Sequence, residues 1–397
     1  MAQSVATALP KRAAAVDKLG VVIAIIIAAA WIFLPFADFK PNRILPGEPR
    51  SVFAALPLVE ASMLAMVLAV SLPLTFFRTP TVARLVMSFA GLGAVAVFIG
   101  IAGYHLTPDG DKLARIAPGA GFWVFTGAYA LLAADALTRL RLAPWPRIAI
   151  LALVAIAIAL LLWSGAWNSL SILKEYANRA DAFWREAQTH VVLAFGSVIV
   201  AIIVGIPLGI ACYRNGRLRT VVLNTLNAVQ TIPSIALFGL LIAPLGALAA
   251  AIPALAAIGV SGIGAAPAMV ALFIYSLLPV VSNTVVGLLG VPEAANDAAR
   301  GMGMTNRQRL FSVELPLAFP VILTGIRIVL VQNIGLATIA ALIGGGGFGV
   351  FVFQGIGQTA MDLVLLGAVP TVALAFASAV ILDAIVEMIS PRETAND

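Results

Sequence analysis

The sequence predicts an all-α integral membrane protein with about ten transmembrane helices and both termini in the cytoplasm. Of its 397 residues, 61% are hydrophobic and only 11% are charged, whereas soluble domains contain roughly 25% charged residues. About ten apolar runs reach the roughly 20 residues that a helix needs to cross about 30 Å of hydrocarbon. These runs lack the alternating pattern of barrel strands, so we expect helices to span the membrane.

The first half of the chain is expected to contain five of these spans. We place them at about residues 19–37, 53–77, 85–105, 119–138 and 148–165, within an N-terminal region of residues 1–165. The apolar stretch from Leu19 to Phe36 follows basic residues, but it is too long for the core of a signal peptide and is interpreted as a retained span. Further basic clusters predict a cytoplasmic N-terminus by the positive-inside rule: Arg78 and Arg84; Arg139, Arg141 and Arg147; Arg214, Arg217 and Arg219.

The second half is expected to form a five-helix core of residues 188–390, with spans at about 188–212, 221–243, 266–289, 319–343 and 363–388. Residues 166–187 combine charges with apolar residues at helical spacing, which predicts an amphipathic linker at the periplasmic interface. Residues 247–263 are interpreted as an outer or re-entrant loop. No Asp, Glu, Lys or Arg occurs from Thr220 to Pro292 or from Ile328 to Met361, so a path through this core would contain little fixed charge.

Other sites and partners are disfavoured by the residues present. The net charge of +6 is divided among short clusters between spans, so no nucleic-acid partner is expected. Cys212 is the single cysteine, and His105 and His190 lie 85 residues apart in sequence, so we expect no metal site. The run from Gly344 to Gly347 lacks the Lys and Ser or Thr of a phosphate loop and predicts a tight turn instead. No catalytic constellation is present, so we expect neither an enzyme nor a cofactor bound by this chain.

Residues 290–319, between the eighth and ninth expected spans, differ in character from their surroundings. They form a charged cytoplasmic segment of about thirty residues between two apolar spans. Ala298, Ala299 and Met302 fall at helical spacing and predict a short amphipathic helix that rests against another protein. Gly301 and Gly303 are expected to interrupt this helix and to allow a sharp turn or a close backbone approach, and Pro316 to stop whatever element follows.

The spacing within this segment resembles a known signature. Asp297-Ala298-Ala299, three residues, Gly303, nine residues and Val313-Glu314-Leu315-Pro316 are similar to the E-A-A, G and I-x-L-P pattern of ABC importer permeases, with Asp for Glu and Val for Ile. Glu293-Ala294-Ala295 is a near-repeat in the wrong register. In that family the segment is the coupling helix, which docks in a groove of the ATPase subunit. The resemblance therefore implies coupling through Asp297, Ala298, Ala299, Gly303, Val313, Leu315 and Pro316.

Further motifs over about residues 186–388 resemble the permeases that import osmoprotectants such as glycine betaine, choline and carnitine. The N-terminal region looks like that of the Yeh-type members. The resemblance implies a type I ABC importer core in a bacterial inner membrane, a second permease, a periplasmic substrate-binding protein, and ATPase subunits that bind ATP and Mg. The motifs are Gln230 to Ser234, Leu277 to Pro279 with Asn283 and Thr284, Gly325 to Arg327, and Ile343 to Gly349.

Five residues are candidates for the translocation path: Gln230, Pro233, Phe273, Tyr275 and Asn283. Gln230 and Pro233 are expected within the seventh span, where they either line the path or satisfy contacts between helices. The two aromatic rings either attract a quaternary ammonium group or pack in the core. An ion-coupled secondary transporter is the alternative function, but it predicts inverted repeats and charges near the midplane, and the two charge-free stretches disfavour it.

Overall fold

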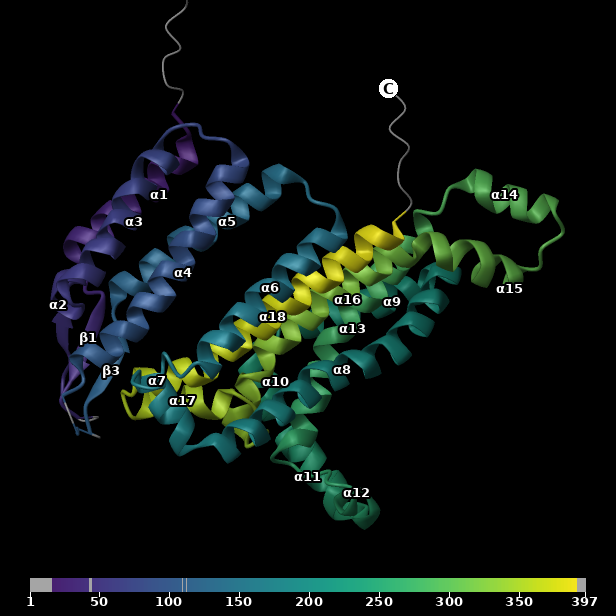
Figure 1. The fold of residues 1–397 in the computed structure, drawn as a ribbon. Helices are drawn as coiled ribbons and strands as arrows, with labels where there is room; N and C mark the ends of the chain where they lie inside the picture. The colour runs from purple at the N-terminus through teal and green to yellow at the C-terminus, as the bar shows by residue number, and fades with distance from the viewer. Residues whose placement is uncertain (1–15, 43–44, 109, 112, 391–397) are drawn as a thin grey trace, which may run out of the picture. The chain divides into compact units, whose positions relative to one another are not determined.

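The computed structural model describes residues 16–42, 45–108, 110–111 and 113–390. Both chain ends, which the sequence predicts to be cytoplasmic, lie outside the described residues. The described residues divide into two compact units (Figure 1): one contains those from Val16 to Leu142 and Ala155–Lys174, and the other contains Ala143–Val154 and those from Glu175 to Ser390. Helix α6, Pro144–Trp163, contributes to both units.

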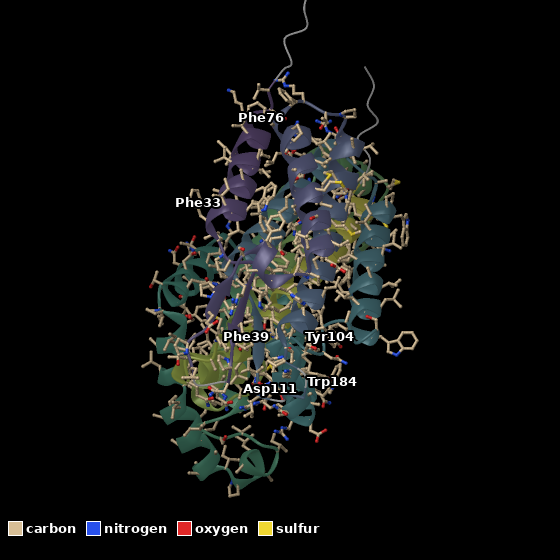
Figure 2. All side chains as sticks on the ribbon, turned by 60° about the vertical axis from the view of Figure 1, so that its left-hand side comes forward. Phe33, Phe39, Phe76, Tyr104, Asp111 and Trp184 are labelled. Carbon is tan, nitrogen blue, oxygen red and sulfur yellow. The ribbon has the colours of Figure 1, made fainter. Side chains whose placement is uncertain are left out.

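The first unit is built from apolar helices, and proline marks the start of two of them. Because proline has no N–H and disfavours a helical residue before it, Pro57 and Pro80 lie at the N-caps of α3 and α4. The expected span at 53–77 is therefore broken into α2 and α3. Exposed apolar side chains such as Phe33, labelled in Figure 2, suit a lipid-facing surface. The helices are α1 (Lys18–Phe33), α2 (Val52–Ala55), α3 (Leu58–Phe76), α4 (Thr81–Leu106) and α5 (Ala120–Leu140).

A small antiparallel sheet is an addition to the predicted all-helical fold. Its strands are β1 (Ala37–Lys40), β2 (Glu48–Arg50) and β3 (Arg115–Pro118), in the order β2-β1-β3. Ala37 is paired with Arg50 on one side and with Pro118 on the other. Strands of three or four residues are too short to show an alternating pattern, and their pairing joins segments that are distant in sequence.

An ion-pair cluster around the buried side chains of Arg84 and Asp17 joins three helix ends of the first unit. Arg84 at the start of α4 contacts Asp17, the N-cap of α1, with 3.1 Å between Nη1 and Oδ2. Its Nη2 donates to the carbonyl of Phe77 at 3.0 Å. Arg139 at the end of α5 contacts Asp17 at 3.1 Å and Asp135 at 2.9 Å. Two of the basic residues that the sequence assigns to membrane orientation, Arg84 and Arg139, are thus also structural partners of acidic side chains.

The second unit contains the expected five-helix core and the charged segment, residues 290–319, that follows α13. A glycine lets two of its helices approach closely, because a Cβ at Gly325 on α16 would lie 2.6 Å from the Cβ of Asn283 on α13. The elements are α8 (Ala180–Arg214), α9 (Gly216–Gln230), α10 (Ser234–Leu240), α11 (Ile242–Ala251), α12 (Pro253–Ala257), α13 (Ala265–Leu289), α14 (Glu293–Gly301), α15 (Asn306–Arg309), a π-helical turn (Leu310–Glu314), α16 (Leu315–Ala337), a 3₁₀ helix (Ile339–Ile343), α17 (Gly349–Gly357) and α18 (Met361–Ile389).

Three boundaries in this half differ from the expected ones. The seventh span is not continuous, because the helix breaks between Gln230 and Ser234 before Pro233; the stretch able to span a membrane is Ser234–Ala251. Residues 247–263 accordingly contain the end of α11 and the short helix α12 instead of only a loop. The expected linker contains α7 (Ser171–Asn178), and its last residues already belong to α8.

The described residues contain nine helices that are long and apolar enough to cross a membrane, together with the shorter apolar helix Lys18–Phe33. Five of these ten segments lie at or before Trp163 and five after it. The expected number of spans therefore agrees with the described part of the chain.

Candidate functional site

Helix α14 presents an exposed face at one end of the second unit, where Figure 1 shows α14 and α15 extending beyond the long helices. Glu293 lies in the first turn of α14 and Arg300 in the last, an arrangement that the helix dipole favours. Ala298 and Met302 are exposed, Met302 by 71%, but Ala299 is 1% exposed. The expected common face of Ala298, Ala299 and Met302 is therefore wrong for Ala299, which packs inward toward its own chain.

Gly303 ends this helix with a turn that is closed by two hydrogen bonds. The N–H of Met304 donates to the carbonyl of Ala299 at 3.1 Å, and the N–H of Gly303 donates to that of Arg300 at 2.9 Å. This pair of bonds is the Schellman motif, which requires a left-handed residue at the position of Gly303. Its φ of +78° is in that region, and no heavy atom lies within 4 Å of a Cβ built there. Glycine is therefore favoured at position 303 because of the positive φ, and not because a side chain would lack room there.

The chain then continues into the membrane as one helical rod. Thr305 and Gln308 form a capping box that begins α15, and the helix runs through the π-helical turn into α16. The N–H of Leu315 donates to the carbonyl of Leu310, five residues earlier. Pro316 lies just after the π-helical turn, at the start of α16, and the helix continues past it to Ala337, so the expectation that it stops the element is wrong.

A buried ion pair that the sequence interpretation did not identify supports the π-helical turn. Arg309 Nε donates to Glu314 Oε1 at 2.8 Å, and the two side chains are only 16% and 2% exposed. The pair Asp297–Arg300 on α14 is also close, at 3.2 Å, but its side chains are about 60% exposed. Of the remaining signature residues, Val313 and Leu315 are half-buried and Pro316 is exposed. The five-residue spacing of Arg309 and Glu314 gives no signal in sequence, because it is not a neighbour spacing in an α-helix.

Two of the expected path residues, Gln230 and Tyr275, are brought together and repair two breaks in the backbone hydrogen bonding. Pro279 in α13 cannot donate to the carbonyl of Tyr275, four residues earlier, and Gln230 Nε2 donates to that carbonyl instead, at 2.8 Å. The hydroxyl of Tyr275 in turn donates at 2.6 Å to the carbonyl of Ile232, which precedes Pro233. Both side chains thus satisfy backbone groups that apolar surroundings would otherwise leave unpaired.

Replacement of Tyr275 by Phe should lower the stability of the protein by about 1 kcal/mol, because it leaves the Ile232 carbonyl without this donor. The thermal unfolding midpoint of the detergent-purified protein measures the effect. Tyr104→Phe is the matched control, since its hydroxyl donates to the Gly165 carbonyl at an exposed position. An equal or larger shift in that control would show that the bond to Ile232 has no special weight.

The other path candidates are placed as follows. Pro233 is the exposed N-cap of α10, and Phe273 is half-buried on α13. Asn283 is half-buried against Gly325 and donates to the carbonyl of Pro279 at 2.8 Å. A role in the path stays a prediction for all five residues.

The centre of the second unit contains a buried polar cluster. Asn333 on α16 donates to Ser197 Oγ on α8 at 2.8 Å and to Ser276 Oγ on α13 at 2.7 Å. All three side chains are buried. Such bonds between helices fix their relative positions in apolar surroundings. These residues fall in apolar runs that the sequence interpretation treated as uniform.

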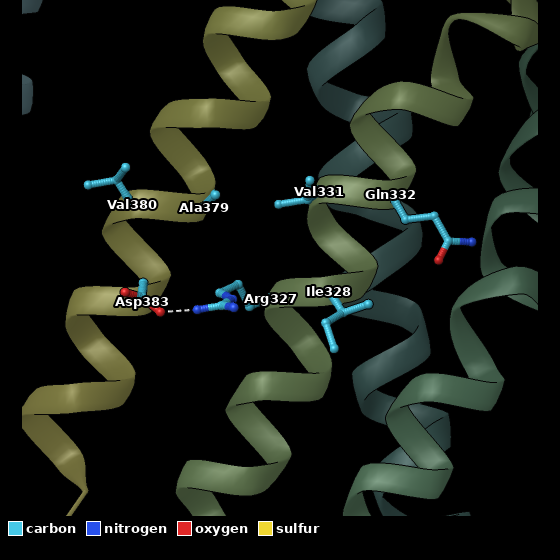
Figure 3. A pocket seen from close by; sticks show the side chains of 7 residues that line it. All are labelled: Arg327, Ile328, Val331, Gln332, Ala379, Val380 and Asp383. Carbon is cyan, nitrogen blue, oxygen red and sulfur yellow. Dashed lines mark hydrogen bonds and ion pairs between the residues drawn. The ribbon is translucent and has the colours of Figure 1, made fainter. Parts of the chain in front are cut away.

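A second charged cluster lies where α6, α16 and α18 meet in the second unit. Arg327 of α16 contacts Asp383 Oδ1 of α18, and Arg147 of α6 contacts Asp383 Oδ2 at 3.2 Å and Glu387 Oε2 at 2.9 Å. Figure 3 shows Arg327 and Asp383 pointing toward one another between their helices, beside a cavity of about 610 Å³. The sequence interpretation had treated Asp383 and Glu387 as ordinary helix-end charges.

The remaining expectations concern the glycine run and metals. Gly344, Gly346 and Gly347 all have φ values between +75° and +84°, so this run forms the tight turn that was expected. Within the part of the chain that the structure describes, no three His, Cys, Asp or Glu side chains are grouped to hold a metal ion.

Comparisons with known proteins match both halves of the chain. Residues 17–173 match the family model described as "ABC transporter permease YehY, N-terminal domain", and residues 197–394 match "Binding-protein-dependent transport system inner membrane component". The chain is 42% identical to the osmoprotectant import permease protein OsmW of Salmonella typhimurium over 203 residues, which cover 51% of this chain and 89% of the relative.

Two further matches each cover about half of the chain. The glycine betaine/carnitine/choline transport system permease protein OpuCB of Bacillus subtilis is 37% identical over 51% of this chain and 86% of its own length. A solved structure titled as an inward-facing conformation of the MetNI methionine ABC transporter aligns with a TM-score of 0.47 at 23% identity, over 53% of this chain and 97% of the solved chain.

These family matches, the described spans and the OsmW identity over most of its length lead to one assignment. The matched component is the multi-pass inner-membrane part of a binding-protein-dependent transport system, and it is a permease without an ATPase domain. The chain belongs to the ABC importer permeases, and it is of the YehY type, with an N-terminal domain before the permease core.

Proposed function

We propose that this permease imports an osmoprotectant, a small zwitterionic or quaternary ammonium solute such as glycine betaine or choline. The observation that carries the proposal is the 37–42% identity of the core to permeases named for these solutes. The absence of Asp, Glu, Lys and Arg from Thr220 to Pro292 and from Ile328 to Met361 supports it, because a path for a neutral or zwitterionic solute needs few fixed charges.

The ATPase subunits would dock on the exposed face of α14, and ATP and Mg would bind to them and not to this chain. Asp297, Ala298 and Met302 offer this face, and the Gly303 turn sets its direction relative to α15. Because the helix continues from Asn306 to Ala337, a displacement of the docked segment would move α16 within the membrane. Ala299, Val313, Leu315 and Pro316 would then act by shaping this segment and the start of α16.

The complete importer would contain a second permease, identical or homologous, and a periplasmic binding protein that delivers the solute. The two permeases would enclose the path, and ATP binding would alternate its opening between the two sides. Recognition would rest largely with the binding protein, so the permease has only to offer a weak site.

The test is uptake of labelled glycine betaine and choline into proteoliposomes that contain the whole importer, with its binding protein outside and ATP inside. We expect accumulation of at least one solute that requires ATP and persists when ion gradients are collapsed. Uptake driven by an ion gradient without ATP would instead support a secondary transporter. ATP-dependent transport of neither solute would refute the osmoprotectant assignment while leaving the family intact.

A further inference from the structure

The groove between α16 and α18 combines a charge pair with mostly apolar walls inside the membrane-spanning core. Its open cavity of about 610 Å³ is lined by Arg327 and Asp383, by the amide side chain of Gln332, and by the apolar side chains of Ile328, Val331, Ala379 and Val380. This volume lies within the range of roughly 300–1,000 Å³ that small-molecule sites occupy. Figure 3 shows Val331 and Ala379 one helical turn away from the charge pair, on the two sides of the same gap.

The two charges are available to the groove even though they contact each other. The side chains of Arg327 and Asp383 remain 33% and 47% exposed in the isolated chain. Asp383 uses Oδ1 for Arg327 and Oδ2 for Arg147, and Arg147 also contacts Glu387 at 2.9 Å. Loss of the Arg327 contact would therefore leave Asp383 with a second cationic partner that does not line the groove.

A zwitterionic solute complements this pair in charge. Its carboxylate matches the guanidinium of Arg327, which offers several donors in one plane, and its cationic group matches the carboxylate of Asp383. Exchange of the internal pair for these two contacts leaves no charge without a partner, which avoids the large cost of an unpaired ion in apolar surroundings. The apolar walls suit the methyl groups of a quaternary ammonium ion.

We propose that Arg327 and Asp383 form a transient zwitterion-binding site in the groove between α16 and α18, with Arg327 holding the solute's carboxylate and Asp383 its cationic group. This inference rests on the proposed function, because it takes the zwitterionic solute class from there. Beyond that function, the inference names two residues of the permease, each of which binds one of the two charged groups of the solute.

The test compares a zwitterion with a cation that lacks the carboxylate. Glycine betaine and choline share the quaternary ammonium group, so Arg327→Gln should reduce turnover of glycine betaine about tenfold or more and that of choline less than about threefold. Asp383→Asn should reduce both. Turnover is measured in the reconstituted importer with saturating binding protein, and ATPase activity and the amount of inserted permease are recorded for each variant.

Two further variants distinguish a binding site from a structural ion pair. Arg327→Gln with Asp383→Asn removes both charges together, and a purely structural pair predicts recovery of transport in this double variant. The binding site predicts that glycine betaine transport stays at or below the level of the single variants. Arg147→Gln is the matched control, because it removes another partner of Asp383 that lies outside the groove lining; its effect should be equal for both solutes.

Each outcome decides between these possibilities. Equal loss of both solutes in Arg327→Gln, or recovery of glycine betaine transport in the double variant, overturns the site and leaves the proposed function standing. If the unmodified importer carries glycine betaine and not choline, the two solutes cannot be compared, and the double variant decides: recovery of glycine betaine transport overturns the site, and continued loss supports it. Transport of choline alone overturns the zwitterion site, and transport of neither solute overturns the proposed function together with it.

Discussion

Replacement of Gly303 by Val should reduce ATP-driven uptake at least tenfold while the protein still inserts into the membrane. A side chain in the left-handed conformation costs roughly 1–2 kcal/mol, and a β-branched one more, so the turn after α14 will relax away from its φ of +78°. The face of α14 would then be displaced relative to α15 and α16. Uptake and ATPase co-purification of the reconstituted importer measure the loss.

Two matched variants separate the backbone effect from simple bulk. Gly303→Asn should retain most of the uptake, because Asn tolerates the left-handed region. Gly301→Val places the same side chain two residues earlier, where φ is not positive and open space also surrounds a built Cβ, so it should retain uptake as well. Wild-type uptake in Gly303→Val would remove this turn from the coupling mechanism, and equal loss in Gly301→Val would assign the effect to bulk.

Removal of the Glu314 side chain should be the most destabilising single change in the segment. Glu314→Ala leaves the nearly buried guanidinium of Arg309 without its partner at 2.8 Å, and loss of one member of a buried pair costs about 3–5 kcal/mol. Arg309 immediately precedes the π-helical turn and Glu314 is its last residue, so amide hydrogen exchange should rise first in this turn. The unfolding midpoint of the purified protein in detergent and local amide exchange report the two effects.

The comparison variants for this pair test whether burial is the reason. Arg309→Met with Glu314→Leu should recover most of the lost stability, because no charge is then left unpaired. Asp297→Ala breaks a pair of similar length on α14 whose side chains are about 60% exposed; its cost should stay below about 1 kcal/mol. A similar loss for Asp297→Ala and Glu314→Ala would contradict an explanation based on desolvation.

Local patterns predicted much of the fold. The apolar runs located the spans, because a helix must satisfy its backbone within one segment when it crosses hydrocarbon. The motif spacing placed Gly303 at the turn after α14, since a positive φ favours glycine whatever the surroundings. Proline was predicted less well: Pro233 breaks a helix that was expected to continue, and Pro316 is accommodated in one that was expected to stop.

The candidate sites were predictable only in part. Gln230 and Tyr275 were selected as polar or aromatic residues in apolar spans, but their mutual arrangement depends on the packing of α9 and α10 against α13. The pairing of Arg327 with Asp383 joins residues 56 positions apart in the chain. No periodicity links such partners, so the groove and its charges were not anticipated.

By itself, the sequence determined that this is a helical membrane protein, and the resemblance of its motifs to a known signature indicated an importer permease with a glycine turn after α14. The helical spans follow from backbone hydrogen bonding in lipid and the glycine turn from the conformational limits of a single residue, and both reasons are local. Only the tertiary structure decided which charges are paired, which carbonyls Gln230 and Tyr275 satisfy, and where α16 and α18 leave a groove. These features depend on contacts between helices that are distant in sequence. An unpaired polar group is costly in apolar surroundings, so each one must have a partner, but this cost does not determine which residue the partner is.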